Sequence, residues 1–131
     1  MSMIRIATFS AAFVLVVHGL IHLMGTAVYA RHAEFKGLSY KTTLLSGHWE
    51  LREGGIRVFG WLWVLPAIGF ALAALALPAG WGWWKPVLIG TTLLSLAITT
   101  VDWSNAFMGA IVDIVILALV LLSTRFTAWT S

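Results

Sequence analysis

Four long apolar stretches, separated by short polar or turn-forming segments, dominate the pattern of hydrophobic and polar positions along the chain. They run over residues 4–30, 55–77, 85–101 and 106–123. Each is close to or above the roughly 17–25 residues that a helix needs to cross the hydrocarbon core of a bilayer. The pattern predicts an all-α membrane protein, a four-transmembrane-helix bundle that forms one integral membrane domain over residues 1–131.

Turn signals between the stretches support these boundaries. Pro78, Ala79 and Gly80 interrupt the chain between the second and third spans, and a polar segment from Asp102 to Asn105 separates the third from the fourth. Pro66 lies inside the second span and should kink it, because proline lacks the N–H that the helix requires. With four spans, both termini are expected on one side of the membrane.

Residues 31–54 form the one sizeable connection, between the first and second spans. Connections in helical bundles usually have about 2–8 residues, and longer ones tend to be functional or disordered. This one mixes charges with apolar side chains such as Leu44 and Trp49. We therefore expect a long loop with a short amphipathic segment over the mouth of the bundle, where residues 40–53 would cover a pocket.

Composition agrees with lipid as the surrounding solvent. Of the 131 residues, 60% are hydrophobic and only 10% are charged, whereas a soluble domain has about 25% charged residues. The basic residues form no cluster, which excludes nucleic acid as a partner. The chain has no cysteine, so disulfides and thiol redox chemistry are excluded. The expected partners are membrane lipid, a small lipophilic ligand, and either further copies of the chain or a larger membrane complex.

Ionisable side chains inside the spans indicate a functional interior, because their burial in a membrane is costly. His18 and His22 are four residues apart on the first span and therefore share one helix face. Asp113 lies deep in the fourth span, where it needs a proton or a partner. Arg57, near the start of the second span, is a candidate partner.

Polar residues at steps of three and four continue this interior on the third span. They are Thr92, Ser95, Thr99 and Asp102. All of these groups belong to the half of the bundle nearest residues 31–54, whereas a pore would need polar lining throughout. The pattern thus predicts a pocket open to one membrane face. The candidate catalytic residues are His18, His22, Asp113 and Arg57. The candidate ligand-binding residues are Tyr29, Trp49, Glu50, Thr99 and Asp102.

Structural interpretations of the same residues compete with this one. The two histidines could be core residues that hydrogen-bond across helices, and Asp113 could form a purely structural ion pair. Arg57 and Asp102 could place their charges at the interface by snorkelling. The Ser/Thr stripe on the third span could simply hold helices together.

A metal site is a further alternative. His18 and His22 have the spacing of the zinc-protease signature, but Gly19 stands where that chemistry has its glutamate base. Asp113 or Glu50 would have to supply a third ligand. Haem held by histidines of two helices is disfavoured, since the other three spans contain no histidine. No cofactor is identified.

The length, the four spans and the stretch Val17-His18-Gly19-Leu20-Ile21-His22-Leu23 resemble small bacterial membrane proteins of the DoxX-like kind. The resemblance covers the whole chain in architecture and this stretch in motif. It implies a bacterial inner membrane, and many such proteins are described as partners of membrane redox enzymes. Because this chain lacks cysteine, thiol-linked roles do not carry over.

The expected function is membrane-embedded binding of a small lipophilic molecule, such as an isoprenoid, a quinone or a lipid fragment. Asp113 with His18 or His22 would be an acid/base pair for isomerase- or hydrolase-type chemistry, and Arg57 would stabilise negative charge. One alternative is a non-catalytic accessory subunit of a larger membrane complex, whose small-residue seams would include Gly60, Gly69, Gly90 and Gly109. The other is the intramembrane metal site at His18 and His22.

Overall fold

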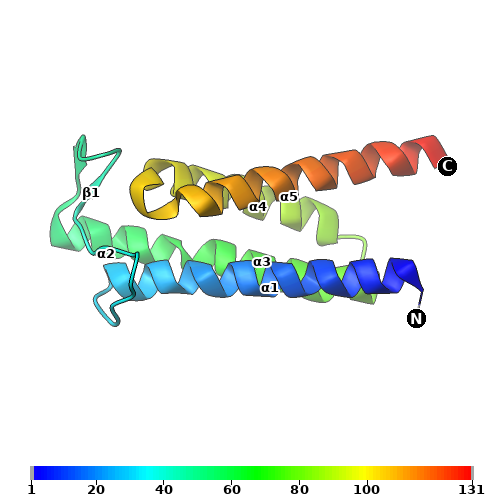
Figure 1. Ribbon diagram of the computed structural model, residues 1–131, viewed down its shortest axis with the longest axis horizontal. Helices are drawn as coiled ribbons and strands as arrows, with labels where there is room; N and C mark the ends of the chain where they lie inside the picture. The colour runs from blue at the N-terminus through cyan, green and yellow to red at the C-terminus, as the bar shows by residue number, and fades with distance from the viewer. Residues whose placement is uncertain (1, 131) are drawn as a thin grey trace.

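The computed structural model describes the backbone of residues 2–130 and the side chains of residues 2–123. The helices of this part are α1 (Met3–Tyr29), α2 (Arg52–Leu62), α3 (Val64–Ala79), α4 (Trp84–Val101) and α5 (Trp103–Thr130) (Figure 1). Helices long and apolar enough to cross a membrane are Met3–Tyr29, Arg52–Ala79, Trp84–Val101 and Trp103–Ser123. The prediction of four helical spans is confirmed, and it indicates an integral membrane protein.

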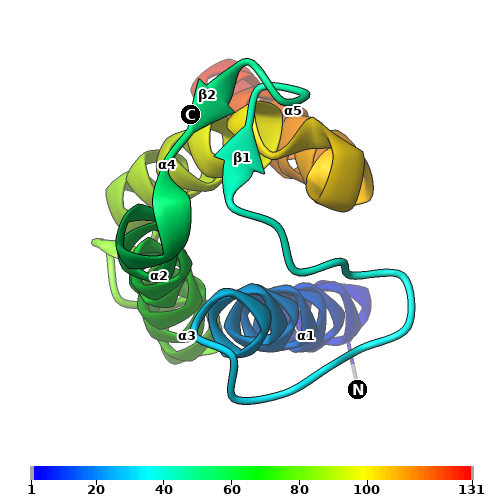
Figure 2. The same cartoon turned by 90° about the vertical axis from the view of Figure 1, so that its left-hand side faces the viewer.

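The helices follow one another around an incomplete ring. α1 packs against α2 and α3, α3 packs against α4, and α4 packs against α5. In the view along the bundle, α1 and α5 face each other across what we call the α1/α5 seam, and the connection after α1 crosses it at one end (Figure 2). Both ends of the chain lie at the opposite end of the bundle, as an even number of spans requires.

The second span is made of two helices, because Pro66 interrupts its hydrogen bonding. α2 ends at Leu62 and α3 begins at Val64. Pro66 has no N–H to donate to the Leu62 carbonyl four residues earlier, so it fits only in the first turn of a new helix. The Trp63 N–H bonds instead to the Gly60 carbonyl at 3.2 Å. The predicted kink is therefore present, just before the proline.

The segment between α1 and α2 is not the single long loop that the sequence suggests. It contains two antiparallel strands of two residues each, β1 (Thr43–Leu44) and β2 (Trp49–Glu50). Leu44 is fully buried, and the Leu45 N–H donates to the Val101 carbonyl at 2.9 Å. These contacts fix the hairpin to the end of α4. Such short strands present too few alternating positions for a period-two pattern to reveal them.

The interior has two apolar clusters with a polar layer between them. The cluster nearer the chain ends includes Leu15, Phe70, Leu88, Ile116 and Val120. The cluster beneath the hairpin includes Tyr29, Leu44, Ile56, Phe59 and Trp63. The buried polar side chains of the layer are His18, His22, Thr92, Ser95, Thr99 and Asp113. The polar groups thus meet near the middle of the spans rather than at their ends.

Candidate functional site

A buried hydrogen-bonded network joins α1, α4 and α5 across the α1/α5 seam. Asp113 on α5 is fully buried, and its Oδ1 lies 2.8 Å from His18 Nε2 on α1. Its Oδ2 lies 2.6 Å from the Ser95 hydroxyl on α4. That hydroxyl lies 2.7 Å from His22 Nε2. We call His18, His22, Ser95 and Asp113 the polar network. It connects three spans, and the seam closes here through side chains.

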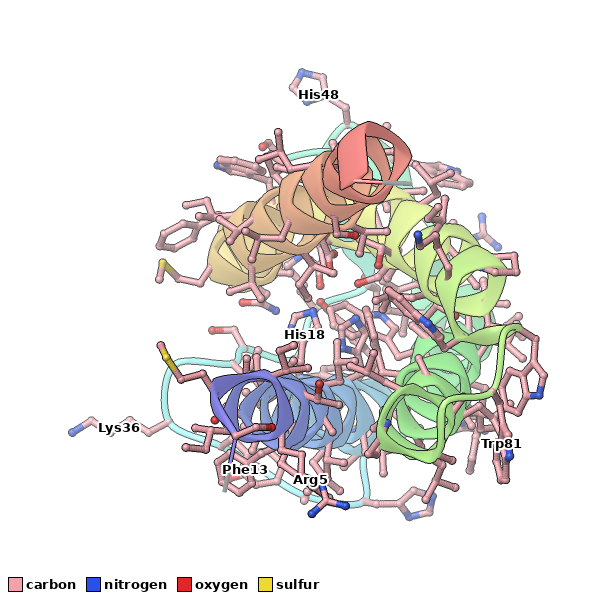
Figure 3. The ribbon with its side chains drawn as sticks, turned by 90° about the vertical axis from the view of Figure 1, so that its right-hand side faces the viewer. Arg5, Phe13, His18, Lys36, His48 and Trp81 are labelled. Atoms are coloured by element: carbon pink, nitrogen blue, oxygen red, sulfur yellow. The ribbon has the colours of Figure 1, made fainter. Side chains whose placement is uncertain are left out.

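His18 and His22 lie on the face of α1 that is buried in the bundle, so both side chains point inward. Figure 3 shows His18 directed from α1 toward α4 and α5, whereas Phe13 on the same helix points away (Figure 3). The Phe70 ring of α3 packs edge-on against the His18 ring at 4.8 Å between centroids. α1 can approach α3 this closely because residue 19 is glycine, where a Cβ would come within 3.2 Å of the Ala67 carbonyl oxygen.

The donors and acceptors of the polar network can be satisfied in two ways, which differ in whether one proton resides on His22 or on Asp113. His22 Nδ1 lies 2.9 Å from the His18 carbonyl, which only accepts, so Nδ1 carries a hydrogen. Ser95 has a single hydroxyl proton and lies between two partners. If it donates to Asp113, then His22 is doubly protonated and Asp113 is ionised. If it donates to His22, then Asp113 carries the proton and donates to Ser95. Both placements satisfy these bonds and differ only by transfer of a proton along Ser95.

A cavity of about 230 Å³ adjoins the polar network between α1 and α5. Its polar lining includes His18, His22, Trp63, Thr99 and Asn105. Trp63 is only 4% exposed, and within the described residues its indole Nε1–H has no hydrogen-bond partner. A buried donor left without an acceptor costs about 1–3 kcal/mol. Because this nitrogen is itself buried, the cavity is lined by other atoms of Trp63 and not by its N–H.

Trp63 takes up its position against a glycine of α1. A Cβ at Gly25 would lie 2.7 Å from the Trp63 ring, so only glycine leaves room for the indole. The ring also lies 5.4 Å from the His22 ring, centroid to centroid. The cavity therefore meets an aromatic wall and the histidines on the same side.

A second set of polar side chains lies at the hairpin end of the seam. Tyr29 OH donates to Asp102 Oδ2, and Lys41 Nζ donates to Asp102 Oδ1 at 2.5 Å. Burial raises the pKa of Asp102 above its usual value, and the hydrogen bond from Lys41 opposes that rise. Asn105 donates to Tyr29 OH at 3.0 Å. We call Tyr29, Lys41, Asp102 and Asn105 the mouth network.

The mouth network also anchors the connection where it crosses the seam. The Asn105 side chain donates to the Ser39 carbonyl at 2.8 Å and accepts from the Ser39 N–H at 3.3 Å. The residues just before Ser39, from Lys36 to Leu38, line the cavity. Thus residues 36–39, rather than the predicted residues 40–53, cover the cavity at this end.

Of the predicted catalytic residues, the structure brings together His18, His22 and Asp113 but not Arg57. Arg57 is exposed on α2. The buried face of that helix is formed by Ile56, Phe59 and Gly60, which turns residue 57 outward. Arg57 is therefore not among the residues that line the cavity, and its role in stabilising charge stays a prediction.

The predicted ligand-binding residues divide into three groups. Thr99 lines the cavity and donates to the Ser95 carbonyl at 2.8 Å, with Asp113 Oδ2 at 3.5 Å. Tyr29 and Asp102 are buried in the mouth network and are not among the residues that line the cavity. Trp49 and Glu50 are exposed on β2 and do not line the cavity, so their role in ligand binding stays a prediction.

Sequence reasoning did not assign Ser95, Trp63, Lys41 or Asn105 to the site. Ser95 was detectable, because it lies in the polar stripe between Thr92 and Thr99. Trp63 resembles the aromatic residues that favour membrane interfaces, and only its packing against α1 shows otherwise.

The metal alternative receives no support from the described residues. Among them, no three His, Cys, Asp or Glu side chains are grouped so that they could hold an ion. Glu50, one candidate third ligand, is exposed on β2. Both ring nitrogens of His22 already have hydrogen-bond partners, the His18 carbonyl and Ser95.

Comparisons of the chain with protein-family models, with curated proteins and with solved structures give no significant match. The resemblance to DoxX-like proteins therefore stays a prediction, and the functional argument rests on the geometry of the site.

Proposed function

We propose that the protein binds a small neutral lipophilic molecule in the cavity between α1 and α5 and exchanges a proton with it. The observation that carries this proposal is the cavity of about 230 Å³, which adjoins the polar network and is lined by both of its histidines, His18 and His22. Ionisable groups at membrane depth are costly. Their grouping against a cavity supports a role in ligand chemistry.

The charges around the cavity favour a neutral ligand. Asp113 is matched by His18, and Asp102 is matched by Lys41. Lys36 lines the cavity with part of its chain, but Figure 3 shows its ammonium directed away from the bundle. Because each inward acid already has a basic partner, an anionic head group would meet no free cation among these groups. A hydroxyl or carbonyl group, by contrast, suits the neutral polar side chains that line the cavity, such as Thr99 and Asn105.

His18 is the group through which a proton would reach the ligand. It lines the cavity and contacts Asp113 directly. Asp113 and Ser95 then connect it to His22, which also lines the cavity. A proton accepted at one histidine can therefore be matched by a proton returned at the other, which leaves the net charge of the network unchanged. Such a pair supports proton transfer within a ligand, as in an isomerisation, or general acid–base assistance to a hydrolysis. The membrane is the bacterial inner membrane if the DoxX-like resemblance holds.

The alternative role as an accessory subunit loses part of its support. It relied on small residues that would allow close approach of a partner helix. A Cβ at Gly60 would meet Tyr29, one at Gly69 would meet Thr91, and one at Gly109 would meet Thr99. Of those glycines, only Gly90 has open space around it. The other three serve packing within the chain.

Native mass spectrometry of the gently purified protein tests the proposal, with Trp63→Phe and Trp61→Phe compared side by side. Trp61 is 53% exposed on the same helix pair and serves as the matched control. Trp63 forms part of the cavity wall beside His22, so replacing its indole by the smaller phenyl ring should weaken ligand retention in Trp63→Phe alone. If the wild type carries no small molecule and instead co-purifies with other membrane subunits, the accessory role replaces our proposal.

A further inference from the structure

We propose that the ligand enters the cavity sideways from the bilayer, through an opening between α1 and α5 that we call the lateral portal. This inference rests on the proposed function and names the class of ligand: a neutral molecule that is dissolved in the membrane rather than in water. It also gives Met24 of α1 and Met108 of α5 a role, because their side chains flank the portal and limit the size of the molecules that pass.

One side of the cavity is formed by side chains that are also exposed on the outer surface. Ile21 of α1 and Met108 of α5 both line the cavity, and they are 49% and 60% exposed. Met24, which follows Ile21 on α1, lines the cavity too and is half-buried. The cavity therefore reaches the surface between these residues. Because α1 and α5 both have the length and apolarity of membrane spans, the solvent outside this opening is lipid.

Two hydrogen-bonded links between α1 and α5 bound the portal along the helices. At one end His18 contacts Asp113 at 2.8 Å, and at the other Asn105 donates to Tyr29 OH at 3.0 Å. At a rise of 1.5 Å per residue, the stretches 18–29 of α1 and 105–113 of α5 are about 12–16 Å long. Between the two links, none of the described side chains joins α1 to α5 by a hydrogen bond. Side-chain rotation alone can therefore widen this part of the α1/α5 seam.

The side chains at the portal suit the passage of a neutral molecule. Methionine is unbranched and has three rotatable bonds, so Met24 and Met108 can change shape at little cost. Gly109, next to Met108, also lines the cavity and adds no side chain of its own. A neutral molecule can pass these groups directly from lipid, whereas an ion would first have to give up its hydration at a large cost.

The end of the cavity that faces the loop is closed by contrast. Residues 36–38 line the cavity there, and the next residue is fixed through its backbone. The Ser39 N–H donates to the Asn105 side chain at 3.3 Å, and the Ser39 carbonyl accepts from it at 2.8 Å. Entry from water requires that these hydrogen bonds break and that the backbone moves, and entry from lipid requires neither.

A single reporter cysteine tests the route in the full-length protein in lipid nanodiscs. The chain has no cysteine, and Thr99 lines the cavity while only 1% exposed, so Thr99→Cys reports what enters the cavity. The probe is butyl methanethiosulfonate, a neutral reagent that dissolves in the bilayer, and intact-mass spectrometry gives its rate of reaction. In this background Met108→Trp should slow modification several-fold, and Met108→Ala should accelerate it. Ile114→Trp and Ile114→Ala are the matched controls, because Ile114 is exposed on α5 and does not line the cavity.

The outcomes separate this inference from the proposed function. Opposite changes of rate in the two Met108 variants, with both Ile114 variants at the reference rate, support the lateral portal. Equal rates in all of these variants overturn it. Slower modification in Lys36→Trp, at the end that faces the loop, without slowing in Met108→Trp also overturns it and shows entry from water. In both of these cases the reagent still reaches the cavity, so the proposed function stands. If the reporter thiol reacts in SDS but in no variant in nanodiscs, the cavity is closed to small neutral molecules and the proposed function fails as well.

Discussion

Replacing Asp113 by asparagine tests how the protons of the polar network are distributed. At membrane depth, burying an ionised His22 and an ionised Asp113 is costly. We therefore expect the neutral placement, in which Asp113 carries the proton, to dominate. The asparagine carboxamide reproduces that placement. Its oxygen can accept from His18, and its NH₂ can donate to Ser95, whose hydroxyl then donates to His22. Asp113→Leu, by contrast, supplies neither donor nor acceptor.

The structure gives the size of the difference. In Asp113→Asn every hydrogen bond has a successor, so we expect the free energy of unfolding to change by less than about 1 kcal/mol. In Asp113→Leu, the His18 Nε2 at 2.8 Å loses its partner, whereas the Ser95 hydroxyl keeps His22 at 2.7 Å. With about 1–3 kcal/mol for a buried unsatisfied group, the loss should be about 1–3 kcal/mol.

Unfolding of both variants in bicelles, followed by far-UV circular dichroism during titration with SDS, measures these values. Infrared spectroscopy provides an independent readout, because the neutral placement contains a protonated carboxyl whose C=O band should vanish in Asp113→Asn. The reasoning is refuted if Asp113→Asn unfolds as easily as Asp113→Leu and the wild type lacks that band. The network would then depend on an ionised Asp113.

Two further predictions concern packing and pH. Gly60→Ala places a Cβ 2.6 Å from the Tyr29 Cβ, so overpacking should cost about 1–3 kcal/mol of stability. Gly90→Ala, by contrast, meets open space and should stabilise α4 by up to about 1 kcal/mol. Equal midpoints of SDS unfolding for the two variants would contradict this packing. Because burial raises the folded-state pKa of Asp102 above its usual 3.8, its contribution to stability is complete below that value and is lost as the pH rises through the raised pKa. Asp102→Asn should flatten this part of the stability profile in thermal unfolding across that pH range, and an unchanged profile would argue against it.

The sequence predicts the four spans and the inward position of the histidines and Asp113. In lipid, a long apolar stretch indicates a span, and an ionisable residue within it is expected to face the interior. The pairing of Asp113 with a histidine could also be predicted, but the link through Ser95 to His22 could not, since Ser95 differs little in sequence from a serine that merely packs. Arg57 was expected in the site because of its charge. The apolar positions of the same helix indicate otherwise, since its buried face is formed by Ile56 and Phe59 and Arg57 lies outside that face.

The break in the second span is another feature that the sequence predicts only in part. Pro66 predicts a break, but only the tertiary structure shows that the break carries Trp63 against Gly25 and beside His22. A contact between residues of different helices has no local signature. The same holds for Lys41, whose partner Asp102 lies 61 residues further along the chain.

The bond between His18 and Asp113 also has a consequence for biosynthesis, since it links the first span to the last across 95 residues. At about 5–20 residues per second, translation of that interval takes about 5–20 s. During this time the first helix is in the membrane with a histidine that lacks its eventual acceptor. A chain that stops before the last span never acquires Asp113, so its first helix keeps a histidine without this acceptor.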